Sequence, residues 1–103
     1  VTAEAFIGTL RQSISLKDNG ETLGLGINYF ADLGGAESAS LPASPSVGDS
    51  VRLKAPSNCS SINTLTISRQ GSHTIDGETS VVLESPFAAV EFVYIANNLW
   101  RIF

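Results

Sequence analysis

The sequence predicts a small all-β protein, an antiparallel sandwich or barrel-like domain with a short helical or extended segment at its N-terminus. Two observations lead to this prediction. Apolar and polar residues alternate in short runs, as in strands with one buried face. These runs recur at a spacing of about ten residues and are separated by turn-forming Gly, Pro, Asn and Ser. We assign residues 38–103 to a β-rich domain and residues 1–37 to an N-terminal segment with a first hairpin.

The N-terminal segment carries one turn signal between two alternating runs. Its first ten residues have apolar residues four apart, which favours a short helix. Residues 12–16 and 21–30 then alternate, and Asn19-Gly20 between them suits a type I′ hairpin turn because both residues accept positive φ angles. We therefore predict an antiparallel hairpin. Its second strand would place Leu23, Leu25, Ile27 and Tyr29 on one face.

The rest of the chain reads as a series of strands and tight turns. Residues 32–46 form a loop with a brief extended piece at residues 38–41. The side chains expected to face the core are those of Val51, Leu53, Leu65, Ile67, Val90, Phe92, Tyr94, Trp100 and Ile102. The turns are expected at Gly48-Asp49, Asp76-Gly77 and Asn97-Asn98.

The composition excludes several classes of protein. Six Lys and Arg against ten Asp and Glu give a net charge of -4, which disfavours nucleic acid or an anionic membrane as a partner. Cys59 has no second cysteine to pair with, and His73 is the only histidine, so we expect no disulfide, no metal site and no cofactor. We expect Cys59 to be an inert thiol that is buried or bound in a loop, and His73 to lie in a surface loop. The close pair Arg52 and Lys54 would share the solvated face of a strand.

Four motifs in the second half resemble the carboxy-terminal domain of tail-fibre and receptor-binding proteins of tailed bacteriophages. In chain order they are residues 40–53 (SLPASPSVGDSVRL), 63–69 (NTLTISR), 74–77 (TIDG) and the run from Val93-Tyr94 through Trp100-Arg101. The resemblance covers residues 38–103, about two thirds of the chain. The N-terminal 37 residues lie outside it.

The resemblance implies a homotrimeric module without enzymatic activity at the distal tail fibre. Such a module is part of the virion, is assembled in the bacterial cytoplasm with the remainder of the tail fibre, and is exposed extracellularly. Its partner would be a bacterial surface glycan or an outer-membrane component, bound without membrane insertion. No catalytic residue is carried over. Apolar residues near the N-terminus, including Ile14 and Leu16, would form the contact between chains or the link to a fibre shaft.

Candidate contact residues follow from side-chain type. Sugar sites combine an aromatic platform with short polar side chains, which points to Tyr29, Asn97 and Asn98 as receptor or glycan contacts. Two alternatives stay open. One is a monomeric carbohydrate-binding β-sandwich module. The other is a polysaccharide-degrading tail-spike domain in which Asp76 and Glu78 form the carboxylate pair, because their spacing along a strand suits an inverting glycosidase.

Overall fold

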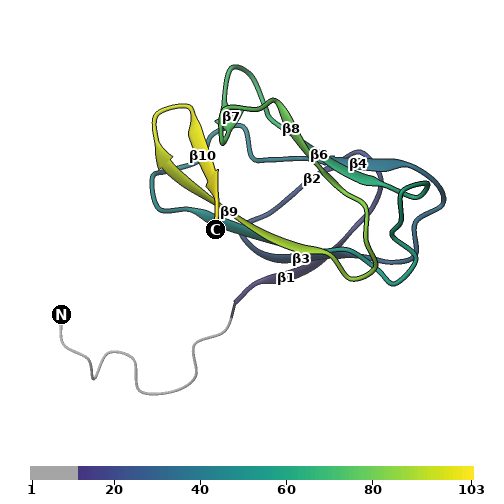
Figure 1. Cartoon of the computed structure of the whole chain (residues 1–103). Helices are drawn as coiled ribbons and strands as arrows, with labels where there is room; N and C mark the ends of the chain where they lie inside the picture. Colours follow the sequence, from purple (N-terminus) through teal and green to yellow (C-terminus); the bar gives the residue numbers. More distant parts are fainter. Residues whose placement is uncertain (1–11) are drawn as a thin grey trace, which may run out of the picture.

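Ten strands in two sheets make up the fold in the computed structural model, which describes residues 12–103 (Figure 1). The all-β fold class is confirmed, since these residues contain no helix and hence none that could cross a membrane. The helix favoured near the N-terminus falls on residues outside the described part.

The two sheets pack face to face around one core (Figure 1). The six-stranded sheet has the order β1-β3-β5-β9-β10-β7. It contains β1 (Ile14–Lys17), β3 (Gly26–Phe30), β5 (Ser50–Lys54), β9 (Ala89–Ala96), β10 (Leu99–Ile102) and β7 (Thr74–Ile75). The four-stranded sheet has the order β2-β4-β6-β8. It contains β2 (Glu21–Thr22), β4 (Glu37–Ser40), β6 (Leu65–Ser68) and β8 (Ser80–Leu83).

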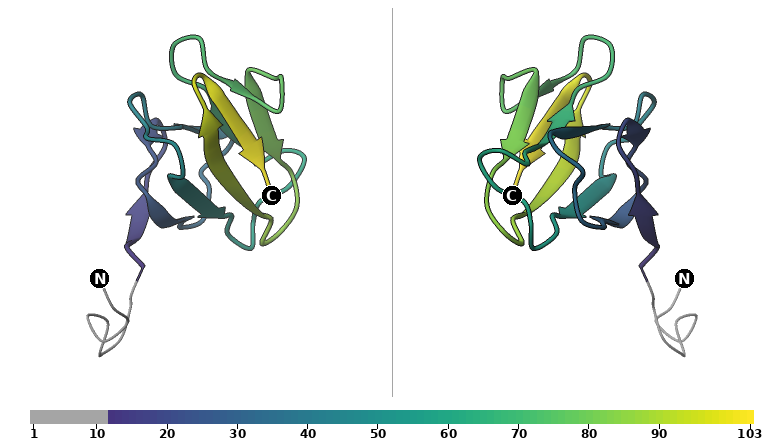
Figure 2. Two further views of the ribbon diagram at one scale, coloured as in Figure 1. Left: turned by 90° about the vertical axis from the view of Figure 1, so that its left-hand side faces the viewer. Right: turned by 90° about the vertical axis from the view of Figure 1, so that its right-hand side faces the viewer.

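The first six strands wind as three stacked coils. They alternate between the two sheets, and from β3 to β6 each strand pairs in parallel with the strand two places earlier. Ile14 thus lies opposite Ile27 and Ile27 opposite Arg52 in one sheet, while Glu21 lies opposite Ala39 in the other. The views from the two sides show how the chain passes from one layer to the other (Figure 2). Five of the eight strand pairs are parallel, so the sheets are mixed where the sequence predicted antiparallel ones.

The two ends of the coil stack differ in the direction of strand pairing. After β6 the chain reverses, so that β8 runs antiparallel to β6 and β9 antiparallel to β5. The turn at Asn97-Asn98 then folds β10 back onto β9, as predicted. On the opposite side β1 and β2 each pair with one described strand only. The parallel winding therefore begins at the edge strands β1 and β2, while the reversed end of the stack has β7 and β8 as its edge strands.

The predicted first hairpin is wrong. Residues 18–20 do turn, and Gly20 has a φ of +84°. The Gly20 N–H, however, donates to the Ser38 carbonyl and the Asn19 Oδ1 accepts from the Ser38 N–H, which fixes the chain against β4. The chain therefore crosses into the second sheet at Asn19-Gly20 and does not fold back on β1.

The prediction that the apolar residues of the second hairpin strand share one face is also wrong. Leu23 is buried and Leu25 is exposed. Gly26 has a φ of +86°, and a Cβ there would lie 2.6 Å from the Ser13 carbonyl oxygen. Only glycine allows this close approach, and the residue restarts the alternation, so that Ile27 and Tyr29 face away from the core.

The core lies between the sheets and draws on residues from both sides of position 37. Its buried apolar side chains are those of Leu23, Phe30, Leu33, Ala39, Leu41, Val51, Leu53, Ala55, Cys59, Leu65, Ile67, Ile75, Leu83, Phe92, Tyr94 and Trp100. Most inward positions predicted from alternation are thereby confirmed, with Val90 packed partly against the cluster. Ile102 is the exception and stays at the surface.

Cys59 and His73 both lie in the interior of the fold. Cys59 is fully buried and its thiol donates to the Leu83 carbonyl, 3.3 Å away, which confirms an enclosed thiol. The surface position predicted for His73 is wrong, because its side chain is only 9% exposed. Its ring packs on that of Tyr94 with the centroids 5.5 Å apart.

Candidate functional site

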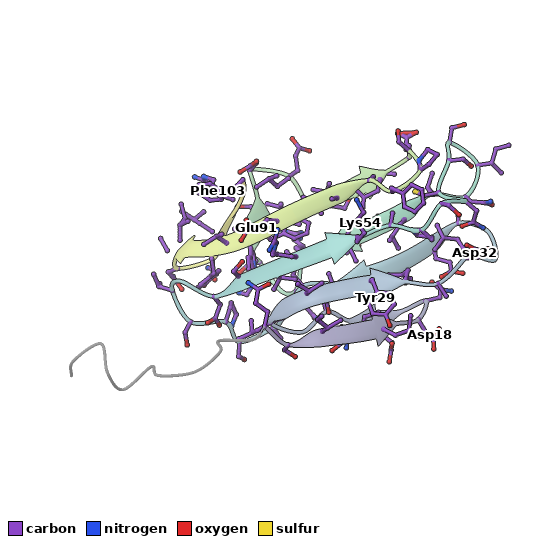
Figure 3. The ribbon with its side chains drawn as sticks, turned by 90° about the horizontal axis from the view of Figure 1, so that it is seen from below. Asp18, Tyr29, Asp32, Lys54, Glu91 and Phe103 are labelled. Atoms are coloured by element: carbon purple, nitrogen blue, oxygen red, sulfur yellow. The ribbon has the colours of Figure 1, made fainter. Side chains whose placement is uncertain are left out.

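The outer face of the six-stranded sheet carries most of the exposed apolar and cationic side chains of its strands (Figure 3). Strand register sets them in cross-strand rows, because residues that pair across a sheet share a face. One row is Ile14, Ile27, Arg52 and Glu91. The next is Leu16, Tyr29, Lys54 and Ala89. The face thus changes from apolar on β1 to cationic on β5.

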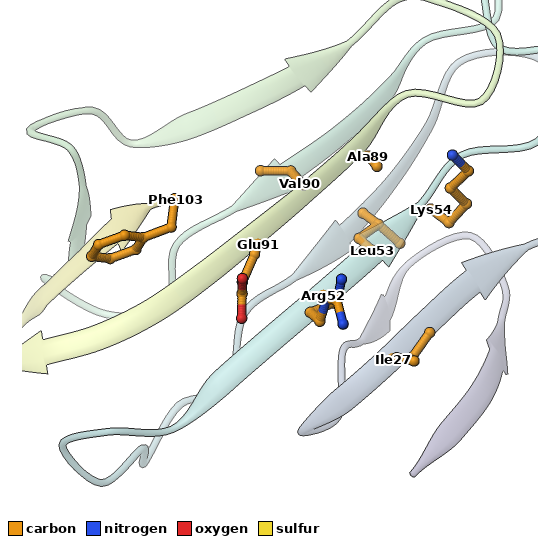
Figure 4. A pocket seen from close by; sticks show the side chains of 8 residues that line it. All are labelled: Ile27, Arg52, Leu53, Lys54, Ala89, Val90, Glu91 and Phe103. Carbon is orange, nitrogen blue, oxygen red and sulfur yellow. The ribbon is translucent and has the colours of Figure 1, made fainter. Parts of the chain in front are cut away.

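A groove lies on this face along β5 and β9 (Figure 4). Its volume is about 430 Å³, within the range of small-molecule sites. The lining residues are Ile27, Arg52, Leu53, Lys54, Ala89, Val90, Glu91 and Phe103. The Phe103 N–H donates to the Glu91 carbonyl, which continues the β9–β10 pairing and places the terminal ring on the same face as Glu91.

The two cations of the groove are free of carboxylates. Arg52 and Lys54 are both exposed, which confirms the solvated face predicted for them. Among residues 12–103 neither has a carboxylate oxygen within 4.0 Å. Glu91 lies opposite Arg52 but accepts a 2.7 Å hydrogen bond from the Ser50 hydroxyl. Lys54 instead places its Nζ 5.9 Å from the centroid of the Phe87 ring, a cation–π contact.

The sequence-predicted contact residues lie at two separate places. Tyr29 is 43% exposed and lies beside Lys54, next to the groove (Figure 3). Asn97 and Asn98 form the turn at the other end of β9, about 26 Å along the strand from Ala89. The structure therefore does not bring the asparagines together with Tyr29.

Asn98 has a structural role in that turn. Its φ is +63°, a left-handed conformation that Asn tolerates better than most residues. Its N–H donates to the Tyr94 hydroxyl at 2.6 Å and its carbonyl accepts from the Thr74 N–H. The Asn98 backbone thus ties the turn to the core aromatic Tyr94 and to β7.

Sequence reasoning missed Glu91 and Phe103 as groove residues. Alternation along β9 indicated an outward Glu91. That it lies opposite Arg52 follows only from the register between β5 and β9, which no local pattern contains. The position of Phe103 likewise depends on its pairing with Glu91.

The carboxylate pair of the enzymatic alternative sits elsewhere. Asp76 and Gly77 have φ angles of +48° and +84°, which confirms the predicted tight turn. The Asp76 Oδ1 accepts from the Ile102 N–H at 3.3 Å and lies 3.9 Å from the Arg101 Nε. Asp76 therefore holds the turn against β10. Within the described residues no group of three or more His, Cys, Asp or Glu is placed to hold a metal ion.

Comparison with known proteins adds no assignment. No protein-family model matches the chain, and no curated protein sequence matches it significantly.

Proposed function

We propose that this chain is the carboxy-terminal β-rich domain of a bacteriophage tail fibre and binds a bacterial surface receptor during adsorption. In this proposal the domain is a homotrimer in the distal part of the virion's fibre, acts by binding alone, and contacts a surface glycan or an outer-membrane component. The four ordered motifs of residues 40–101 are the sequence support.

The observation that supports this function best is the asymmetry of the coil stack. Parallel coils extend a structure in one direction, because each new strand adds to the edge of the last. Here the chain reverses after β6, while β1 and β2 leave their outer edges open among the described residues. A stack whose parallel winding stops at β6 but leaves its first two strands available for further parallel pairing suits the end of an elongated fibre.

The outer face of β1 is our candidate for the contact between chains. Ile14 and Leu16 are 64% and 55% exposed on a strand whose outer edge has no described partner. Exposed apolar edge strands invite association, and soluble proteins usually cover them. Further copies of this chain would cover both features in a homotrimer.

Leu16→Asp is expected to convert the trimer into single chains, because a carboxylate would be buried without a partner in the contact. Light scattering after gel filtration should give about three times 10.8 kDa for the unchanged chain and about 10.8 kDa for the variant. Ile62→Asp is the matched control, since Ile62 is an exposed apolar residue in the loop between β5 and β6 and should leave the mass unchanged. A single-chain mass for the unchanged protein at micromolar concentration would favour the monomeric carbohydrate-binding module.

The receptor function is tested on whole cells. Fluorescently labelled chain is incubated with a panel of bacterial strains and measured by flow cytometry. We expect saturable binding to a narrow group of strains that unlabelled chain competes away. Equal binding to all strains, or to none, would contradict the proposal. Release of reducing ends from host polysaccharide that is lost in Asp76→Ala would instead favour the tail-spike alternative.

A further inference from the structure

The groove concentrates positive charge on an acidic protein. Of the five Lys and Arg in residues 12–103, two line the groove, whereas one of the nine Asp and Glu in the same residues does. That one carboxylate, on Glu91, already accepts a hydrogen bond from Ser50. Two cations and one carboxylate give the groove lining a formal net charge of +1 on a chain of net charge -4, so Arg52 and Lys54 can both contact an anionic ligand.

The spacing of the two cations suits one ligand of limited size. They are two residues apart on β5 and point to the same side, so their Cα atoms are about 6.6 Å apart. Arg52 offers the planar fork of donors that matches a carboxylate, while Lys54 offers a point charge with three donors. Within the described residues neither side-chain nitrogen head group makes a hydrogen bond or an ion pair, and Lys54 has only its contact with the Phe87 ring.

Besides its three charged residues, the groove is lined by apolar side chains. Ile27 lies beside Arg52, Phe103 lies on the far side of Glu91 from Arg52, and the small Ala89 lies opposite Lys54 (Figure 4). Tyr29 adds a second exposed aromatic ring beside Lys54. A ligand that fits must combine an anionic group with a flat nonpolar surface. A sugar ring that bears a carboxylate has both, because its C–H groups form a nonpolar face.

Two other anionic partners fit less well. Nucleic acid would meet a chain of net negative charge with only two adjacent cations. An extended acidic peptide usually binds by adding to a free strand edge, and here β5 and β9 pair with each other along the groove. The geometry therefore favours a saccharide lying on the face of the sheet.

We propose that this groove binds an acidic saccharide, with Arg52 and Lys54 holding its carboxylate and Phe103 packing on its ring. This inference rests on the proposed function and names the ligand class of the same receptor site. In this proposal Tyr29, which pairs with Lys54, lies at the border of the site.

The test measures binding of the full chain to defined polymers by isothermal titration calorimetry. The probes are polygalacturonate and polysialic acid as carboxylated saccharides, dextran as a neutral saccharide, and poly-L-glutamate as an acidic polymer without sugar. We expect binding to at least one carboxylated saccharide, much weaker binding to the other two classes, and loss of affinity as salt is raised. No binding to either carboxylated saccharide, or equal binding to poly-L-glutamate, would overturn the proposal.

Single variants assign the binding to the groove. Arg52→Ala removes a charge-assisted contact and should weaken binding about tenfold to a hundredfold. Phe103→Ala should weaken it about fivefold through loss of the aromatic contact. Arg69→Ala is the matched control, because Arg69 is an exposed arginine just after β6 in the other sheet and should bind as the unchanged chain does. Unchanged affinity in Arg52→Ala, or an equal loss in Arg69→Ala, contradicts the assignment.

The same variants separate this inference from the receptor function. If the chain binds bacterial cells and an Arg52→Ala/Lys54→Ala double variant binds them equally well, the domain is a receptor-binding protein whose site lies elsewhere. If the unchanged chain binds no cells, the proposed function itself fails.

Discussion

Trp100→Ala is expected to lower the free energy of unfolding by about 3–5 kcal/mol. Trp100 is fully buried and its ring packs against Tyr94, with the centroids 5.2 Å apart. The substitution removes the largest fully buried side chain and leaves a cavity between β10 and the core. Because domains of this size are stable by only about 5–15 kcal/mol, much of the protein should unfold under mild denaturant. Urea unfolding followed by circular dichroism, at one fixed protein concentration, measures the loss.

Trp100→Phe is the informative companion variant. It keeps an aromatic ring, and the indole Nε1 that it removes has no hydrogen-bond partner among the described residues. We therefore expect a loss of less than half that of Trp100→Ala, set by the smaller cavity. Phe87→Ala removes an exposed aromatic ring and its cation–π contact with Lys54, and should lower the free energy of unfolding by about 1 kcal/mol or less. A Trp100→Ala loss below about 1 kcal/mol would show that this end of the fold is not packed as described.

Asn28→Ala is expected to destabilise the protein by about 3 kcal/mol through lost hydrogen bonds. Asn28 is fully buried on β3. Its Oδ1 accepts from the Gly24 N–H at 2.9 Å, and its Nδ2 donates to the Gly24 carbonyl at 2.9 Å and to the Arg52 carbonyl at 3.0 Å. One amide thus joins the corner before β3 to the next coil. Its removal leaves buried backbone groups of the stack without this partner.

Asn63→Ala is the control for that effect. Asn63 is a half-buried loop asparagine whose side chain makes one hydrogen bond, a 3.3 Å contact from its Nδ2 to the Asn58 carbonyl. We expect it to cost about 1 kcal/mol or less in the same urea experiment. If Asn28→Ala costs no more than Asn63→Ala, the hydrogen bonds of Asn28 do not hold the coils together.

Local patterns in the sequence predicted strands, turns and core positions well. Val51 and Leu53 lie in the core because alternation fixes which face of a strand is buried, whatever it pairs with. The Asp76-Gly77 and Asn97-Asn98 turns follow from side chains that tolerate positive φ angles.

Those local patterns did not predict which strands pair with each other. Asn19-Gly20 favours a tight turn in either setting, and alternation does not distinguish a hairpin from a corner between sheets. Contacts far along the chain, such as that of Gly20 with Ser38, decide between the two.

For the candidate site, too, the sequence predicted individual residues but not the pairing of strands that brings them together. Arg52, Lys54 and Tyr29 were assigned to exposed or contact positions from their own strands. The groove that connects Arg52 with Glu91 and Phe103 exists only once β9 lies beside β5. A binding site made from the face of a sheet is therefore hidden from sequence until the strand order is known.

In the coils of this fold the strand register is constant, whereas the length of the chain between paired strands varies. Ile14 pairs with Ile27, thirteen residues later, and Ile27 pairs with Arg52, twenty-five residues later, in the same uninterrupted parallel register. The extra residues are taken up at the corners between the layers. Lengthening a flexible loop costs only about 0.6 kcal/mol for each doubling. Insertions and deletions at these corners can therefore remodel the molecular surface over evolutionary time while the hydrogen-bonded stack beneath keeps its form.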